Sequence, residues 1–399
     1  MEKPTILLSA GSGKFGSGEL LFLDYLLSSG EKWFNPLIIF PSDGPLVTAY
    51  EKAGLETIII PGLDYLTDSH LIWRQPLAWV YNLSSFMRVR RLIRKRNVRL
   101  VVSLSFINWT GALSARQEGI PHIWMIREVL SGEKTHLKFF WGKWLATRLA
   151  NDLSVRVLLE SSEVVKMFSH KRMRDKAMFL PPAINAEKFL RLLDGPPAPT
   201  YTSGEPVVGI FINDYDEKRI RLVLEAVGQA LKKISADKGF MARAAIYFPG
   251  IERNKIDLLW SKLQLLVTDL NSGSELSSFL GDFSDFLSFP SSWKKLSVAI
   301  FIPGFDPLNR LLLEAGLSAI PTLVEAGAAS ELVIPGKTGF VFSAGNYQEI
   351  IAGLINVFSQ EGLASSIGLE ARKHIIQNYS LEDWRKHWEK IVEESLIGN

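Results

Sequence analysis

The chain has 399 residues, which is too many for one hydrophobic core and fits two domains. Apolar residues make up 47% of the chain, so both domains can bury a large core. It contains no cysteine, which excludes disulfides, thiolate metal sites and thiolate catalysis, and its net charge of +3 is too small to indicate nucleic-acid binding.

Neither a signal peptide nor a membrane span is expected. Met1–Leu8 contains a lysine but only a short apolar patch, which stops at Ser9. The longest uncharged run, Leu100–Ala115, is shorter than a membrane span and contains several polar side chains. We therefore expect a cytoplasmic protein.

Short apolar runs bounded by turn residues predict a series of strands in the first half of the chain. Their alternation with helical segments is typical of a parallel sheet, whose ligands bind at the carboxyl ends of the strands. The predicted strands are Thr5–Ala10, Leu37–Phe40, Thr57–Ile60, Leu100–Leu104, Ile120–Glu128, Val155–Leu159 and Ala177–Leu180.

A glycine-rich turn, Gly11–Glu19 (GSGKFGSGE), follows the first strand. Its first three glycines have the form of a dinucleotide-binding fingerprint, but the acid expected at the end of the next strand is displaced to Asp43. A phosphate-binding P-loop is excluded because Leu8 and Phe15 occupy positions that require glycine and Ser or Thr. A ligand-binding turn whose amides approach an anion, and a plain tight turn, are the remaining alternatives.

Phe86–Arg99 is strongly basic and amphipathic. This pattern favours a surface helix with one apolar stripe and a solvated basic face. Docking to an anionic membrane surface is the functional alternative. A second segment, Thr135–Arg148, is aromatic and cationic, and either contact with a substrate or a lipid, or core packing, explains it.

The strand Ile120–Glu128 ends in two charged residues, Arg127 and Glu128. Charged side chains at the carboxyl end of a parallel strand point toward the ligand-binding edge, so we predict that both belong to the site. The alternative is a surface ion pair, which contributes little to stability. His122, early in the same strand, is predicted to be a structural histidine.

The clearest linker is the proline- and glycine-rich stretch Asp194–Gly204, and we expect domains at 1–190 and 205–378 with a final helix at 379–399. Strands are predicted in the second domain at Pro206–Ile212, Ala244–Phe248, Val298–Ile302 and Pro321–Val324. Helices are predicted at Ile220–Ile234, Leu308–Leu317, Asn346–Phe358, Gly368–Gln377 and Ser380–Ser395.

Two acidic segments precede helices in this domain. Asp214 and Asp216 have the spacing of an Asp-x-Asp metal motif, but first-turn acids that favour the helix dipole are the preferred interpretation. Asp306 and Pro307 are predicted to begin the helix that contains Glu314, as its N-cap and its first helical residue.

The order and spacing of these motifs resemble the retaining glycosyltransferases of family four. Asp306 and Glu314, with seven residues between them, match the family's pair of glutamates, the first acid being one methylene shorter. The matching loops and turns are Gly16–Glu19 for Gly-Gly-x-Glu, Gly327–Glu331 for Gly-Gly-x-x-Glu with Ala328 in place of the second glycine, and Pro335–Gly339 for the family turn. More of the matching motifs lie in the second half of the chain than in the first.

The resemblance implies an α/β fold of two Rossmann-like, doubly wound domains facing across a cleft (GT-B), with the last helix crossing back to the first domain. It implies transfer of a hexose, with retention, from a UDP-linked donor such as UDP-glucose to a polysaccharide or lipid-linked oligosaccharide. The sugar nucleotide would be the donor substrate, with no other cofactor and no metal.

The resemblance also implies roles for individual residues. Glu314 would bind the ribose, and Asp306 the donor sugar. Lys218 would stabilise the diphosphate; Asn213 replaces the family's first cation there, and Arg219 is its candidate substitute. Arg127 stands where the family often has a histidine. The backbone positions implied for donor binding are Gly16, Ser17, Gly18, Gly304, Phe305, Pro307, Leu308 and Asn309.

Two other functions stay open. A sugar-nucleotide epimerase of the same fold would need acid and histidine residues at the site, and none of the six histidines is in a matching position. The three departures from the family pattern at Asp306, Arg127 and Asn213 keep a non-catalytic sugar-nucleotide-binding subunit open as an alternative.

Overall fold

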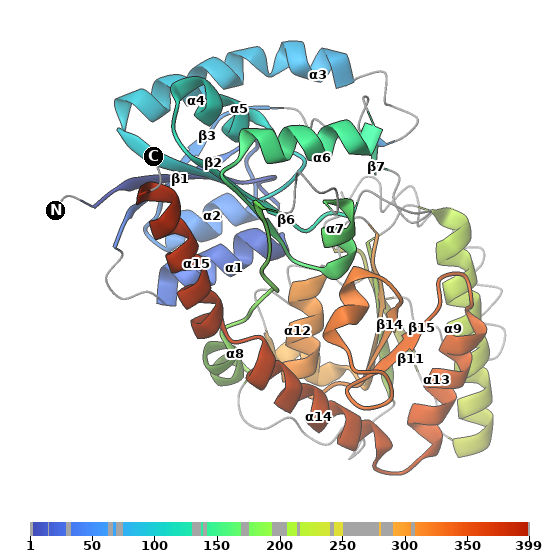
Figure 1. The fold of residues 1–399 in the computed structure, drawn as a ribbon. Coiled ribbons are helices and arrows are strands. Elements are labelled where there is room, and N and C mark those ends of the chain that lie inside the picture. The colour runs from blue at the N-terminus through green and yellow to red at the C-terminus, as the bar shows by residue number, and fades with distance from the viewer. Residues whose placement is uncertain are drawn as a thin grey trace. The chain divides into compact units, whose positions relative to one another are not determined.

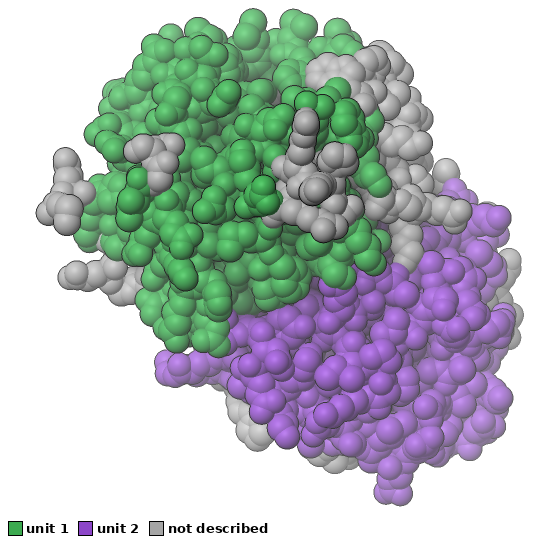
Figure 2. Space-filling view, in the orientation of Figure 1, with its two compact units in different colours: residues 1–183, 381–399 green, residues 184–380 purple. Residues whose placement is uncertain are grey.

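The computed structural model divides the chain into two compact units, which Figures 1 and 2 show: unit 1 contains 1–183 and 381–399, and unit 2 contains 184–380. The structure describes residues 3–14, 16–28, 33–62, 67–68, 75–129, 137–138, 142–168, 175–193, 206–213, 216–239, 243–249, 279–280, 290–304 and 308–397.

Unit 1 is built on a seven-stranded, all-parallel sheet with the order β3-β2-β1-β5-β6-β8-β9. The order reverses beside β1, which lies between β2 and β5, so this is the switch point of the sheet. The strands are β1 (Thr5–Ser9), β2 (Asn35–Phe40), β3 (Glu56–Ile59), β5 (Val98–Ser103), β6 (His122–Ile126), β8 (Arg156–Leu159) and β9 (Ala177–Phe179). A separate antiparallel pair joins β4 (Thr67–Asp68) to β7 (Leu137–Lys138).

Helices flank this sheet, and the last helix of the chain contributes to its core. Trp384 and Trp388 of α15 pack edge-on against Phe22 of α1, with ring centroids 5.4 and 5.0 Å apart. The helices of unit 1 are α1 (Ser17–Ser28), α2 (Pro45–Lys52), α3 (Gln75–Tyr81), α4 (Leu83–Lys95), α5 (Thr110–Glu118), α6 (Gly142–Leu153), α7 (Ser162–Met167) and α15 (Leu381–Ile397).

Unit 2 is built on a six-stranded parallel sheet with the order β12-β11-β10-β13-β14-β15, whose switch point lies between β10 and β13. Phe211 of β10 stacks on Tyr247, Trp293 and Phe301, with centroids 4.9, 5.3 and 5.0 Å away. The strands are β10 (Val207–Ile212), β11 (Arg243–Tyr247), β12 (Phe279–Leu280), β13 (Val298–Ile302), β14 (Thr322–Glu325) and β15 (Phe340–Phe342). The central strands β10 and β13 are apolar and almost wholly buried, as expected where helices cover both faces of a sheet.

The α-helices of unit 2 are α8 (Ala186–Leu192), α9 (Glu217–Lys238), α12 (Asn309–Leu317), α13 (Gln348–Ser359) and α14 (Leu363–Asn378), with 3-10 helices η2 (Pro290–Lys295) and η3 (Ala328–Leu332). The predicted fold class, α/β with two doubly wound sheets, is confirmed. In the part of the chain that the structure describes, no single helix is long and apolar enough to cross a membrane; α13 and α14 reach that length only as a pair bent by 105°.

Several predicted helix limits are wrong. The helices predicted at Ile220–Ile234 and Gly368–Gln377 are longer and span Glu217–Lys238 and Leu363–Asn378. The helix after β13 begins at Asn309, and its N-cap is Leu308 rather than Asp306. Leu308 has a φ of 57°, which lies in the left-handed region and cannot belong to an α-helix, so Pro307 is not the first helical residue. The basic helix predicted at Phe86–Arg99 is α4, which ends at Lys95, because β5 begins at Val98.

His122 is buried at the start of β6, in agreement with the structural role predicted for it. Its Nδ1 lies 2.9 Å from Ser154 Oγ, and its Nε2 lies 2.9 Å from Ser103 Oγ. Burial lowers the pKa of His122 to about 3, because a charged imidazolium would lose its hydration. The ring is therefore neutral in the folded protein at physiological pH.

Acidification is expected to destabilise unit 1 through His122. In the unfolded chain the ring has its ordinary pKa of 6.5, so below that pH the unfolded state takes up a proton that the folded state does not, until the pH reaches about 3. The free energy of unfolding should fall by up to about 1.4 kcal/mol for each pH unit in this window. Urea unfolding across the window would measure it, and a His122→Asn variant, which cannot titrate, should show a shallower dependence. An unchanged slope would contradict the assignment.

Candidate functional site

In unit 2 the predicted site residues lie where the chain leaves β10 and β13, the neighbouring strands at the switch point. Asn213 directly follows β10, and Pro303 and Gly304 directly follow β13. Ligands of doubly wound sheets bind at this position, outside the carboxyl ends of the strands. The switch point of unit 2 is therefore the candidate site for the donor.

The N-terminus of α9 also lies at this edge. The Asp216 side chain caps the helix, with Oδ1 accepting hydrogen bonds from the backbone N–H groups of Lys218 (3.0 Å) and Arg219 (3.2 Å). This agrees with the preferred interpretation of Asp216 as a helix acid; Asp214 and Tyr215 lie outside the described residues. The Lys218 side chain is exposed on the first turn, where a helix favours anions.

Arg219, on α9, contacts two other segments at this edge: the end of β14 and the residue that follows β13. Its guanidinium pairs with the buried carboxylate of Glu325 at the end of β14 and donates to the Pro303 carbonyl oxygen over 3.1 Å. A buried carboxylate needs such a cation, because desolvation of an unpaired charge is costly. Arg219 therefore has a structural role, and Lys218 is the exposed cation on the first turn of α9.

Asn213 points inward and cannot replace a cation. It is 5% exposed, and its Nδ2 donates to the Pro249 carbonyl oxygen over 2.6 Å. Its Oδ1 is buried, and no described residue donates to it. The backbone passes Gly304 so closely that a Cβ there would lie 1.8 Å from the Asn213 carbonyl oxygen, so glycine is required at 304. Asn213 thus offers an acceptor at the switch point, not a positive charge.

Glu314 is buried inside α12 and already has two donors. Arg310 Nε donates to its Oε1 over 2.6 Å, and Trp293 Nε1 donates to its Oε2 over 3.2 Å. Each carboxylate oxygen can accept a further hydrogen bond. Asn309, the first residue of α12, is also buried. The predicted donor-site residues Phe305, Asp306 and Pro307 lie outside the described residues.

The downstream motifs form turns. Gly327 precedes η3, and Glu331 within it is exposed. Pro335–Gly339 makes a tight turn closed by a bridge between its ends, in which Thr338 Oγ1 accepts a hydrogen bond from Ile334 N–H over 2.7 Å. The resemblance in this stretch is therefore carried partly by residues that shape the backbone.

In unit 1 the glycine-rich turn follows β1 at the switch point of its sheet and covers a buried ion pair. Arg127 Nη2 lies 2.8 Å from Glu19 Oε2, and the two side chains are 6% and 2% exposed. The other Glu19 oxygen accepts the Gly11 N–H over 3.0 Å, and Arg127 Nη1 donates to the Leu104 carbonyl oxygen over 3.0 Å. A Cβ on Gly18 would lie 1.8 Å from Arg127 Nη1, so the pair requires glycine above it.

Glu128 holds the neighbouring loop. Its carboxylate accepts hydrogen bonds from the Ser105 hydroxyl and, over 3.1 Å, from the Phe106 N–H, both just beyond β5. Arg127 and Glu128 thus lie at the carboxyl edge of the sheet, as predicted, but they contact the loops after β1 and β5 through buried hydrogen bonds and are not a surface ion pair.

Several residues of these networks were not among the predicted site residues. They include Glu19 as the partner of Arg127, Glu325 as the partner of Arg219, Arg310 and Trp293 as donors to Glu314, and Ser105 as a donor to Glu128. One signal for Glu325 was available. It is a charged residue at the carboxyl end of a buried strand, the same pattern that singled out Arg127.

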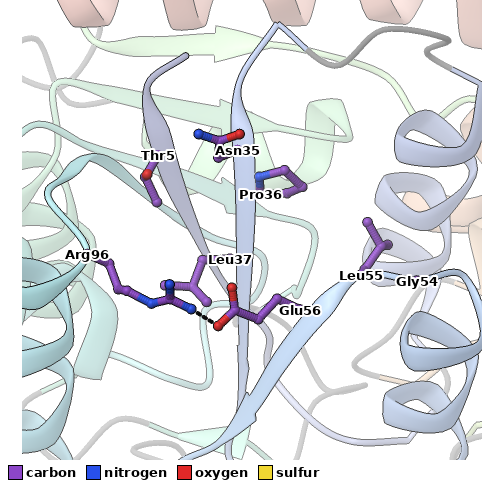
Figure 3. A pocket seen from close by; sticks show the side chains of 8 residues that line it. All are labelled: Thr5, Asn35, Pro36, Leu37, Gly54, Leu55, Glu56 and Arg96. Carbon is purple, nitrogen blue, oxygen red and sulfur yellow. Dashed lines mark ion pairs between the residues drawn. The ribbon is translucent and has the colours of Figure 1, made fainter. Parts of the chain in front are cut away.

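A cavity of about 370 Å³ opens at the opposite, amino edge of the unit 1 sheet (Figure 3). An ion pair between Arg96 and Glu56 lies at its wall. Its lining residues are Thr5, Asn35, Pro36, Leu37, Gly54, Leu55, Glu56 and Arg96. Because ligands of such sheets bind at the carboxyl edge, this cavity is not the donor site.

No family model and no curated protein sequence matches the chain, but solved structures do. HepE from Anabaena in complex with UDP has a TM-score of 0.72 at 18% identity, over 98% of this chain and 100% of that one. A glycosyltransferase from Rickettsia africae has a TM-score of 0.70 at 18% identity, over the whole of both chains. Sucrose-phosphate synthase from Thermosynechococcus elongatus has a TM-score of 0.71 at 12% identity, again over both whole chains.

These neighbours are glycosyltransferases of GT-B type, and the chain has their fold over its whole length. Similarity at this level of identity establishes the fold. The reaction has to be inferred from the site.

The buried pair under the glycine-rich turn leads to a stability prediction. An Arg127→Met variant should lose about 3–5 kcal/mol of unfolding free energy, because Glu19 would remain buried without its cation. Adding Glu19→Gln should recover part of that loss, since the uncompensated charge is then removed. Urea unfolding of the two single variants and the double variant would measure the coupling.

Arg191→Met is a matched control, because the Arg191–Glu187 pair is fully at the surface, with both side chains 76% exposed. It should change the unfolding free energy by less than about 1 kcal/mol. Strictly additive losses at Glu19 and Arg127 would show that the two charges do not depend on one another.

Proposed function

We propose that the protein is a sugar-nucleotide-dependent glycosyltransferase that moves a hexose from a UDP-linked donor, such as UDP-glucose, to a polysaccharide or lipid-linked oligosaccharide. The observation that supports this best is the similarity of fold over 98% of the chain, with a TM-score of 0.73, to HepE in complex with UDP-glucose. In the proposal, side chains at the switch point of unit 2 bind this donor.

The diphosphate would be bound at the N-terminus of α9. Breaking the glycosidic bond places negative charge on the leaving diphosphate, so cations and helix N-termini directed at it lower the barrier. Lys218 is the exposed cation on the first turn, while Arg219 pairs with Glu325 and fixes that turn against β13 and β14. With Asn213 neutral and turned inward, Lys218 carries most of this task.

Carboxylates suit the sugar and the ribose because they accept hydrogen bonds from paired hydroxyls. In the proposal Glu314 binds the ribose, with its orientation fixed by Arg310 and Trp293, and Asp306 binds the donor sugar. The donor KM of a Glu314→Asp variant would test the first role.

Retention and metal independence are part of the proposal: a departing phosphate oxygen can take the acceptor's proton, so Arg127 need not act as a base.

Arg127 has a different role in the proposal. By neutralising Glu19 it removes the negative charge closest to the glycine-rich turn. The backbone amides of Gly16, Ser17 and Gly18, at the N-terminus of α1, then keep their attraction for an anionic group.

The proposal predicts turnover of a UDP-hexose. Incubation with a panel of UDP-hexoses and a mixture of oligosaccharide acceptors should release UDP and extend an acceptor, and EDTA should leave the rate unchanged. Proton NMR of the product would report the anomeric configuration, with retention expected. Binding of the donor without release of UDP would identify a binding subunit, and an altered hexose on intact nucleotide would identify an epimerase. Either result would overturn the proposal.

The exposed cation gives a residue-level prediction. A Lys218→Gln variant should lose about 10²–10³-fold in kcat/KM for the donor, the loss expected on removing one group that stabilises transition-state charge. Steady-state kinetics with varied donor would measure it. Lys232→Gln, an exposed lysine further along the same helix, is the control and should leave kcat/KM unchanged. Equal kinetics in both variants would exclude Lys218 from the diphosphate site.

A further inference from the structure

Helices α3 and α4 continue one another across a single residue. Asn82, between them, keeps right-handed helical angles, with φ −73° and ψ −5°. The helical hydrogen bonds run through it: Asn82 N–H donates to Ala78 O over 2.9 Å, and Phe86 N–H donates to Asn82 O over 2.8 Å. Figure 1 shows the two helices end to end along unit 1. Residues 75–95 therefore share one helical period.

One side of this α3–α4 rod is buried in unit 1. Ala78, Ser85, Val89 and Ile93 are at most 3% exposed. At about 100° per residue, these positions fall on the same side of a continuous helix. These buried side chains pack the rod against the rest of unit 1, so its opposite side faces outward.

The opposite side, here called the α3–α4 face, is exposed and has two halves. The half toward α3 is apolar: Val80 is 72% exposed, Leu77 61% and Met87 49%, and Tyr81, which is 54% exposed, lies at the border with the buried side. The half toward the end of α4 carries Arg88, Arg91 and Lys95, all exposed. Three large apolar side chains on one side of a helix are more than the single exposed residues that are normal on protein surfaces.

The charges of this segment are of one sign. Residues 75–96 contain six Arg and Lys and no Asp or Glu. Some of these cations have structural partners: Arg90 and Arg94 each lie 2.6 Å from Glu118, and Arg96 pairs with Glu56. By contrast, no carboxylate among the described residues pairs with the three cations of the exposed face, Arg88, Arg91 and Lys95.

We propose that the α3–α4 face docks on an anionic lipid bilayer, with the rod lying in the plane of the interface. The apolar half would enter the boundary between headgroups and acyl chains, and the cationic half would contact lipid phosphates. This combination is the one that holds interfacial helices on anionic membranes, since neither the apolar area nor the charge suffices alone. Because the cations of the face are complementary to anionic phosphates, the charge favours an anionic lipid surface over a neutral partner.

Sedimentation with vesicles tests the proposal. The full-length protein should bind vesicles of phosphatidylcholine and phosphatidylglycerol, should not bind pure phosphatidylcholine, and should dissociate as salt is added. Arg88→Gln/Arg91→Gln/Lys95→Gln should weaken binding about a hundredfold, since each cation near an anionic surface contributes about fivefold. Val80→Ser/Met87→Ser should also weaken it.

Matched controls exist in unit 2. Arg221→Gln/Lys232→Gln/Lys233→Gln removes the same charge from exposed positions of α9, and Leu369→Ser/Ile376→Ser removes two apolar side chains that are 54% and 44% exposed on α14. Both should bind vesicles like the unaltered protein, and circular dichroism would verify that every variant is folded.

Absence of binding to the anionic vesicles, or equal loss in the control variants, would overturn the proposal. So would a dimer in analytical ultracentrifugation that Val80→Ser/Met87→Ser dissociates, because the face would then be a contact between two copies of this chain. The vesicle assay contains no sugar nucleotide, so its outcome is independent of whether the protein turns over a UDP-hexose.

Discussion

The structure depends on keeping buried carboxylates paired with cations at the carboxyl edges of its two sheets. In unit 1, Arg127 neutralises Glu19 beneath the glycine-rich turn; in unit 2, Arg219 neutralises Glu325 and Arg310 neutralises Glu314. Each carboxylate is at most 3% exposed, so the loss of its partner would leave a buried, uncompensated charge, which is strongly destabilising. The Arg127–Glu19 pair lies beneath the turn after β1, the Arg219–Glu325 pair connects α9 to the end of β14, and the Arg310–Glu314 pair joins two turns of α12.

Because buried carboxylates need cations, the cations at the carboxyl edges fall into two groups: those that pair with a buried carboxylate and those that remain available to a ligand. An arginine can pair with a carboxylate and with a backbone carbonyl at once, because its guanidinium has five N–H donors. Arg219 and Arg127 both do this, with the Pro303 and Leu104 carbonyl oxygens. A lysine has a single flexible ammonium group, and Lys218 is directed to solvent on the first turn of α9. Under the proposed function, this leaves Lys218 to bind the diphosphate, although the neighbouring Asn213 carries no charge.

The strands and the fold class could be predicted from the sequence because they depend on local apolar runs, such as Val298–Ile302, whose predicted limits are those of β13. The role of Asp216 was also predictable, since an N-cap acts within its own helix turn. The ion pairs were not predictable: Glu19 and Arg127 are 108 positions apart, and Arg219 and Glu325 are 106 apart. Such pairs depend on strand order, which no local pattern encodes.

The start of α12 was predicted wrongly for a related reason. Asp306 and Pro307 have the local chemistry of a helix start, but the chain enters the helix through Leu308 in a left-handed conformation that costs about 1–3 kcal/mol for a residue other than glycine. Leu308 is 5% exposed and belongs to the core that contains Leu311 and Leu312, so burial of its side chain offsets this strain. Tertiary packing at Leu308 thus overrides the local capping signal, at the edge of the sheet where the donor sugar is proposed to bind.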